Sequence, residues 1–267
     1  MLYRRLNPDR LYITQPNHAW VAGQLAHAWG NADFGAVTPR AAVCLAAAQH
    51  DIAWTLWETA PTWNPHTGYP HCFTEVGVPA HLALWRSAKA LAAPLGRYVA
   101  LLVSLHGTGL YTRFTHWQES AEARPLVSAF LQEEQAWQQQ LITSLSADPL
   151  YTAHVTPNAL ARNQALIATW DALSLAICMG LPEEFQTIAQ VPTAAGLTEL
   201  RLHPGDHTAT TIAIDPWCFH RDRVTVDFEG RTLTHPAANA DEMHSQLAQA
   251  PWRSLEITLI PRSLEVS

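Results

Sequence analysis

Lysine is almost missing from this sequence: only Lys89 is a lysine, and the other 15 of its 16 basic residues are arginines. The 23 acidic residues bring the formal net charge to −7, so the chain lacks the net positive charge with which proteins bind the phosphate backbone of nucleic acids. The composition therefore argues against a dedicated nucleic-acid-binding protein. Charged residues are also few, at 15%, whereas 48% are hydrophobic, which predicts a large core and excludes a disordered chain.

Paired cysteines and long apolar runs are absent too. The four cysteines have no paired spacing, which disfavours a zinc ribbon or a disulfide framework: Cys44, Cys72, Cys178 and Cys218. The first residues lack the apolar run of a signal peptide. The longest apolar stretch, 165–181, contains Asp171 and is too short for a membrane helix. These features predict a cytoplasmic protein with no membrane segment.

The first two thirds of the chain show helical patterns. We expect a helix from an N-cap at Asn17 to about Trp29, and further helices over 41–57, 79–93, 96–111, 121–145 and 157–180. A long loop is predicted between Thr59 and Pro79, where four prolines and two glycines interrupt the pattern.

Beyond Glu199 the pattern changes to short strands. Strands are expected at 199–202, 209–214, 224–228 and 255–260, with an amphipathic helix near 239–249. The sequence thus predicts a mostly α fold, with a helical domain over 1–198 and a small antiparallel β appendage over 199–267.

Asp171 is the first candidate for chemistry, because it lies inside an almost entirely apolar helical segment. A buried carboxylate costs several kcal/mol unless it is paired or bound to a metal. The alternatives are an ion pair with an arginine such as Arg162, a hydrogen bond to a tryptophan, or a metal or catalytic site.

Three histidines also fall on apolar helical faces or at their ends: His18, His50 and His106. A single one of them is more often a core histidine than a ligand. Asp51 follows His50 directly and can turn toward the same point. Helices that each direct such a side chain at the core predict a metal site, since manganese, iron and zinc accept imidazole and carboxylate together.

The order His18, His50-Asp51, Asp171 resembles the H…HD…D signature of the HD superfamily of metal-dependent hydrolases. The surrounding segments His18-Ala-Trp-Val-Ala and Trp170-Asp-Ala-Leu-Ser resemble its first-helix and last-helix motifs. More narrowly, Gln15-Pro-Asn-His-Ala and Leu102-Val-Ser-Leu-His-Gly-Thr-Gly-Leu-Tyr resemble an uncharacterised bacterial family of unknown function. The resemblance covers roughly residues 10–180.

This resemblance implies an HD-type helical bundle with one divalent ion, or two, of manganese, iron, nickel or zinc. The implied ligands are His18, His50, Asp51 and Asp171, with His106 as an additional one. Such an ion lowers the pKa of bound water, so that hydroxide attacks a phosphoester at neutral pH. Besides Asp51, the catalytic candidate is Glu58, which could activate water or only cap a helix end.

The expected contacts to substrate are Gln15, Trp54 and His71. The tryptophans Trp20, Trp54, Trp57, Trp63 and Trp85 could line a ring-stacking pocket or only pack in the core. The sequence selects no role for His66 or His81.

The chain departs from the HD pattern after His50-Asp51, where a lysine that holds phosphate in some HD enzymes is replaced by Ile-Ala-Trp. Arginines could substitute, and nothing in the sequence selects among Arg4, Arg5, Arg113 and Arg162. The leading hypothesis is a phosphohydrolase acting on a small phosphomonoester or phosphodiester, nucleotides included. An HD-type di-iron oxygenase and a non-catalytic metal- or ligand-binding module stay open, as does a homodimer.

Overall fold

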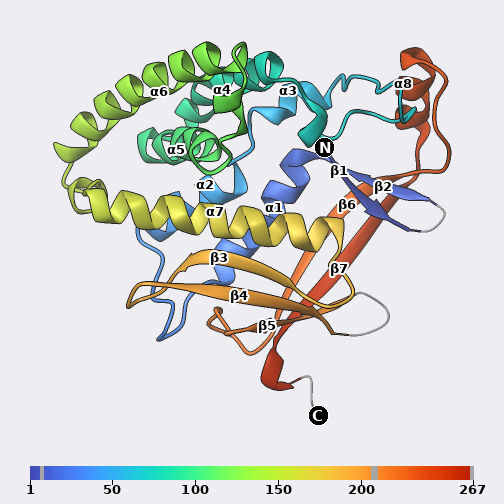
Figure 1. Ribbon diagram of the computed structural model, residues 1–267. Helices are drawn as coiled ribbons and strands as arrows, with labels where there is room; N and C mark the ends of the chain where they lie inside the picture. The colour runs from blue at the N-terminus through green and yellow to red at the C-terminus, as the bar shows by residue number, and fades with distance from the viewer. Residues whose placement is uncertain (7–8, 206–209, 265–267) are drawn as a thin grey trace.

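Helices cover one face of a curled sheet in this protein (Figure 1), whose computed structural model describes residues 1–6, 9–205 and 210–264. The helices are α1 (Gln15–Ala28), α2 (Arg40–Ala48), α3 (Trp54–Glu58), α4 (Val78–Ala92), α5 (Arg97–Arg113), α6 (Ala123–Ser146), α7 (Pro157–Met179) and α8 (Ala240–Gln249). The strands are β1 (Leu2–Arg5), β2 (Arg10–Ile13), β3 (Gln186–Pro192), β4 (Leu197–Pro204), β5 (Thr211–Asp215), β6 (Val224–Leu233) and β7 (Trp252–Pro261).

The seven strands form one mixed sheet in the order β1-β2-β6-β7-β5-β4-β3. Only β5 and β7 pair in parallel, and the other described neighbours are antiparallel. The prediction of a mostly α, HD-type bundle with a small antiparallel appendage is therefore wrong. The chain is about 52% helix and 20% strand and has an α/β fold, in which the sheet curls into a half-barrel.

The missed strands explain the error. β1 carries arginines at two of its four positions, and one of them, Arg4, is buried because its guanidinium donates to the Ile177 carbonyl at 2.7 Å. β3 contains a bulge between Ile188 and Val191, where Gln190 has a φ of 60°. A bulge breaks the two-residue alternation on which strand prediction depends.

Strands from the N-terminal and the C-terminal parts of the chain pair within the one sheet. β2 pairs with β6, and the expected boundary between residues 198 and 199 falls inside β4. The predicted strand at 209–214 corresponds to β5, although residue 209 lies outside the described residues.

Two helix boundaries differ from the predicted ones in a way that matters for function. α1 begins earlier, because the Thr14 side chain rather than Asn17 accepts the capping bond, from the Asn17 amide at 3.3 Å. The helix expected over 41–57 is interrupted, so residues 49–53 form turns between α2 and α3. His50 and Asp51 lie in this interruption, which frees both side chains from helical phase and lets them face the same point.

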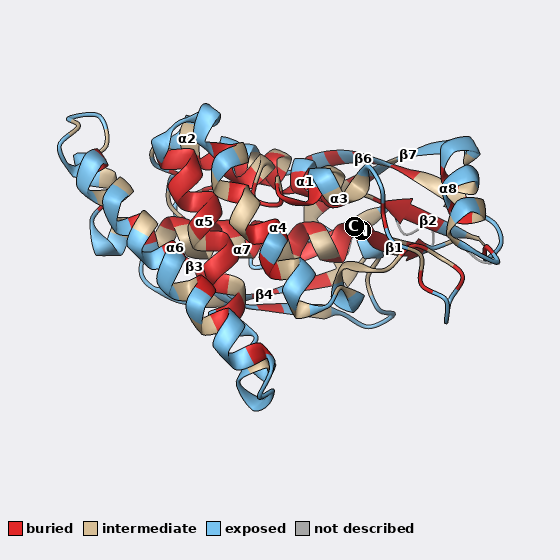
Figure 2. Cartoon of the chain, turned by 90° about the horizontal axis from the view of Figure 1, so that it is seen from above, coloured by how far each residue is buried: buried red, intermediate tan, exposed pale blue. Residues whose placement is uncertain are grey.

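The helices near the sheet place the candidate residues in the interior. α7 lies along β3 of the sheet, and α1, α2 and α5 contact α7 (Figure 1). Figure 2 shows continuous buried faces on α5 and α7. None of the described helices combines the length and apolar character needed to cross a lipid bilayer.

Candidate metal centre

The ligands predicted from the sequence come together from α1, the turn at residues 49–53, α5 and α7. Histidine Nε2 atoms and aspartate oxygens meet at 2.9 Å for His18–Asp51, 3.5 Å for His50–Asp171, 3.8 Å for His50–Asp51 and His106–Asp171, and 4.0 Å for His18–Asp171. Metal–ligand bonds of about 2.0–2.2 Å place neighbouring ligand atoms about 3.0–3.5 Å apart. The cluster is therefore close to the spacing of a shared ion, and it falls into two groups that could hold one: His18, His50 and Asp51, and His50, His106 and Asp171.

The orientation of His50 is set by the chain itself. Its Nδ1 lies 2.8 Å from the Ala47 carbonyl, which can only accept, so Nδ1 carries a proton. The Nε2 atom is buried and has no hydrogen-bond partner among the described residues. An unpartnered imidazole nitrogen facing two carboxylates suits a metal ligand, and this observation favours a cation at the centre.

His18 is held in the same way through a hydroxyl. The Ser174 hydroxyl donates to the Asp171 carbonyl at 2.9 Å and lies 2.8 Å from His18 Nδ1. Since its own proton is committed, the hydroxyl accepts from Nδ1, and the His18 Nε2 atom faces the cluster, 2.9 Å from Asp51 Oδ2. Ser174 thus supplies the outer-shell contact that orients metal-binding histidines.

The imidazoles and carboxylates of the cluster shift one another's pKa values. Burial opposes protonation of His50, but the Asp51 and Asp171 carboxylates outweigh it and raise its pKa to about 9. Burial would raise the pKa of both carboxyls, yet the surrounding imidazoles hold the pKa of Asp51 and of Asp171 below its usual value. The site thus favours a cation between two ionised carboxylates, a place that a metal ion can fill.

His106 closes the cluster from α5. Burial and the nearby positive charge of His50 lower its pKa to about 3, so the ring is neutral. Its Nδ1 has no hydrogen-bond partner among the described residues, and its Nε2 faces Asp171. A neutral imidazole in this position can bind an ion or a ligand.

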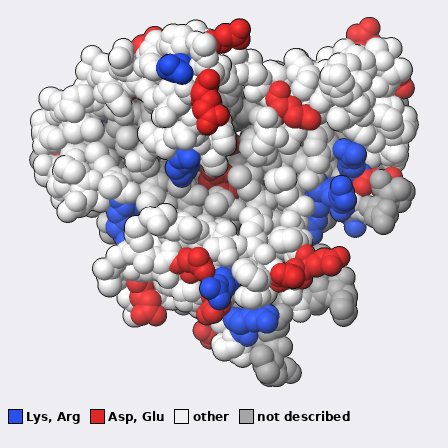
Figure 3. Space-filling view, viewed as in Figure 1, with Lys and Arg blue, Asp and Glu red and all other residues white. Residues whose placement is uncertain are grey.

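Four residues of the cluster, His18, Asp51, His106 and Asp171, line a cavity of about 940 Å³ to which α1, α4, α5, α7 and β3 contribute, whereas His50 is not among its lining residues. Figure 3 shows a hollow near the middle of this face, with acidic atoms in its depth and a basic group beside it. Small-molecule sites have volumes of about 300–1,000 Å³, so the cavity suits an organic ligand. Gln15 and Trp54, two of the expected substrate contacts, line it.

Other sequence-predicted residues lie elsewhere. His71 is not among the residues that line the cavity, and its Nδ1 lies 2.9 Å from the Thr62 hydroxyl. Glu58 does not line the cavity either. Its carboxylate accepts from the Tyr12 hydroxyl at 2.6 Å and from the backbone amide of Gln15 at 2.9 Å. These contacts favour a role for Glu58 in joining α3 to β2 and α1.

The tryptophans divide between cavity and core. Trp54 and Trp85 line the cavity, whereas Trp57 and Trp63 pack against a separate small core and Trp20 is 49% exposed. His81 was not selected from the sequence but lines the cavity, accepting from the Trp85 indole at 3.2 Å. The i, i+4 spacing of these two residues on α4 could have indicated a shared face.

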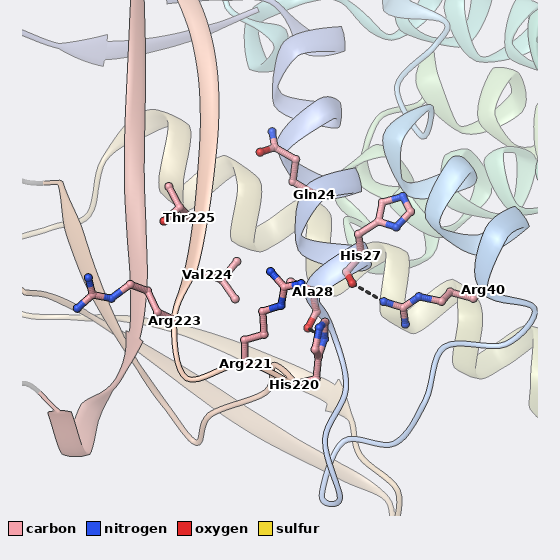
Figure 4. Close-up of a pocket in the computed structure, with 9 residues that line it drawn as sticks. All are labelled: Gln24, His27, Ala28, Arg40, His220, Arg221, Arg223, Val224 and Thr225. Carbon is pink, nitrogen blue, oxygen red and sulfur yellow. Dashed lines mark hydrogen bonds between the residues drawn. The ribbon is translucent and has the colours of Figure 1, made fainter.

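A second, smaller pocket of about 470 Å³ lies at the C-terminal end of α1 (Figure 4). Two of its basic side chains have a structural explanation. Arg40 donates to the His27 carbonyl, and His220 Nδ1 donates to the Ala28 carbonyl at 2.6 Å. Both satisfy carbonyls at a helix end, which carries partial negative charge.

The family model described as a protein of unknown function (DUF3891) matches residues 1–235. The chain belongs to this family. The match contains every residue of the cluster and the lining of the cavity. No curated protein and no solved structure matches the chain, and the comparisons provide no link to the HD superfamily.

Proposed function

We propose that this DUF3891 protein is a metal-dependent phosphohydrolase acting on a small phosphoester. The observation that carries the proposal is the convergence of three imidazoles and two carboxylates, of which all but His50 line a ligand-sized cavity. The H…HD…D order of these ligands resembles that of HD hydrolases, although the α/β fold does not match their bundle.

The geometry favours a single ion. Once the Ala47 carbonyl occupies Nδ1 of His50, only the Nε2 lone pair remains, and one lone pair binds one ion. Because both candidate groups contain His50, they cannot each be complete at once. His18, His50, Asp51 and Asp171 would hold the ion, with His106 beside them as a further ligand or a contact to substrate.

When bound, a divalent ion in such a site polarises a phosphoryl oxygen and supplies hydroxide at neutral pH. The residues of this chain perform the remaining tasks. Ser174 and the Ala47 carbonyl orient two imidazoles, and the walls of the cavity exclude water around the substrate. Asp51 remains the candidate to accept a proton of the attacking water, because it lines the cavity and the neighbouring imidazoles lower the pKa of its carboxyl, which keeps it ionised.

Metal content and turnover test the proposal together. Protein purified without chelators is analysed for metals, and release of phosphate from 4-nitrophenyl phosphate is measured with manganese, iron, nickel and zinc. One ion per chain with metal-dependent turnover that His50→Ala abolishes is the expected result. Two irons with oxidation of an organic substrate would favour a di-iron oxygenase, and bound metal without turnover would favour a binding module.

A further inference from the structure

Arg113 stands out among the residues that line the cavity, because it is their only lysine or arginine. It lies at the last position of α5, seven residues after His106. Seven residues are close to two helical turns, so the two side chains share a face about 10 Å apart along the axis. Gly109 and Leu110 lie between them on this face and also line the cavity.

The other arginines considered from the sequence are committed or distant. Arg4 donates to the Ile177 carbonyl, and Arg162 donates to the carbonyls of Thr193 and Phe34 at 2.7 and 2.6 Å. Arg5 is exposed on β1 and does not line the cavity. Arg113 makes no hydrogen bond or ion pair with the described residues, so its five donors are available to a ligand.

The electrostatic setting of Arg113 suits an anion. Arg113 is exposed, but desolvation by the surrounding protein lowers the pKa of its guanidinium, whereas the nearby Asp171 carboxylate acts in the opposite direction. The group nevertheless stays charged, because arginine does not lose its proton in proteins. A guanidinium on the same wall as an acidic metal cluster provides the positive charge that the missing HD lysine would have supplied.

Apolar and aromatic residues form much of the rest of the wall, among them Trp54, Phe73, Trp85 and several alanines of α7, together with polar residues such as Gln164. Phe114, directly after Arg113, also lines the cavity and is 64% exposed, an unusual exposure for a large aromatic side chain. An aromatic residue beside the free guanidinium at the rim can pack against the organic part of a ligand.

We propose that Arg113 binds the anionic group of the substrate and that Phe114 with the aromatic wall binds its organic part. The substrate class is then a phosphate ester of an aromatic or other bulky apolar alcohol, rather than of a small polar one. This inference rests on the proposed phosphohydrolase function for the reaction, but the binding that it describes does not require turnover.

The test uses two phosphonates that cannot be hydrolysed, phenylphosphonate and methylphosphonate, titrated calorimetrically into the metal-loaded full chain. The parent should bind phenylphosphonate at least tenfold more tightly than methylphosphonate. Arg113→Gln should weaken both about tenfold or more, since it removes charge-assisted hydrogen bonds, and Arg113→Lys should restore part of the loss. Phe114→Ala should weaken phenylphosphonate alone.

Two controls accompany the variants. Metal content should be unchanged in all of them, and Arg221→Gln, which removes an exposed arginine of the second pocket, should bind both ligands as the parent does. Equal binding by Arg113→Gln and the parent, or no phosphonate binding at all, would overturn the role of Arg113. Equal affinity of the parent for the two phosphonates would overturn the substrate class. Arg113-dependent binding without hydrolysis of any ester would contradict the proposed function and leave this inference standing.

Discussion

The Nε2 atom of His50 lies 3.5 Å from Oδ1 of Asp171, and it has no hydrogen-bond partner although it is fully buried. Without an ion, the Asp51 and Asp171 carboxylates favour a proton on this imidazole and raise the pKa of His50 to about 9. An ion shared by His50 and Asp171 would take the place of that proton, because a metal binds the neutral imidazole.

Asp51→Ala should lower metal affinity by about 100-fold or more. Loss of an outer-shell partner alone typically costs 10–100-fold, and Asp51 is expected to be a direct ligand. Glu58→Gln is the matched control, since Glu58 does not line the cavity and its carboxylate accepts from the Tyr12 hydroxyl and the backbone amide of Gln15. It should retain the metal. Affinity is measured by competition with a metallochromic chelator, and equal loss in the two variants would show that Glu58 is a ligand.

Ser174→Ala should lower metal affinity by about 10–100-fold without unfolding the protein. The hydroxyl holds Nδ1 of His18, so its removal lets the ring rotate away from the cluster. Ser146→Ala serves as control, because that hydroxyl only donates to the Ile142 carbonyl on α6. If chelator competition gives the same affinity for Ser174→Ala and the parent, His18 is oriented by its other contacts.

Lys89→Met should lower the free energy of unfolding by about 3 kcal/mol. Lys89, the chain's single lysine, lies 2.7 Å from the Glu134 carboxylate, whose side chain is 2% exposed. Removing the cation leaves that buried charge uncompensated. Arg86→Met breaks the exposed pair with Glu133 and should cost less than about 1 kcal/mol. The free energy of unfolding of both variants is measured by urea denaturation. Similar losses of stability in the two variants would mean that the Ser104 hydroxyl alone satisfies the Glu134 carboxylate.

Gly107→Ala should destabilise the protein by about 1–3 kcal/mol through overpacking. A Cβ at this position would lie 2.5 Å from a ring carbon of Trp85, which contacts His106 and lines the cavity. The control is Gly77→Ala, where the nearest atom would be Pro79 Cδ at 4.0 Å. The midpoint of thermal unfolding should fall in Gly107→Ala and not in Gly77→Ala. An unchanged midpoint in Gly107→Ala would show that the Trp85 indole moves freely.

The sequence alone determined the residue types of the candidate centre and the α-helices near them. Apolar faces with a single histidine or aspartate are visible without a structure, because helical periodicity shows which side chains point inward. His18, His50, His106 and Asp171 could be selected in this way, and Asp51 as the neighbour of His50. The structure brings all five together, although it places His50 and Asp51 in turns rather than on a helix. The helices over 78–92, 97–113, 123–146 and 157–179 likewise follow from local pattern.

Only the tertiary structure decided the sheet and the choice of the arginine. Strand pairing joins residues far apart in the chain, as in β2 with β6. The four residues of β1, two of which are arginines, carry no local pattern that indicates a strand. Every arginine carries the same charge in the sequence, but burial and hydrogen bonding commit Arg4 and Arg162 to backbone carbonyls and leave Arg113 facing the cavity. Whether an arginine can bind a ligand depends on the groups that folding places beside its guanidinium. That environment is set by tertiary packing and not by the position of the arginine in the sequence.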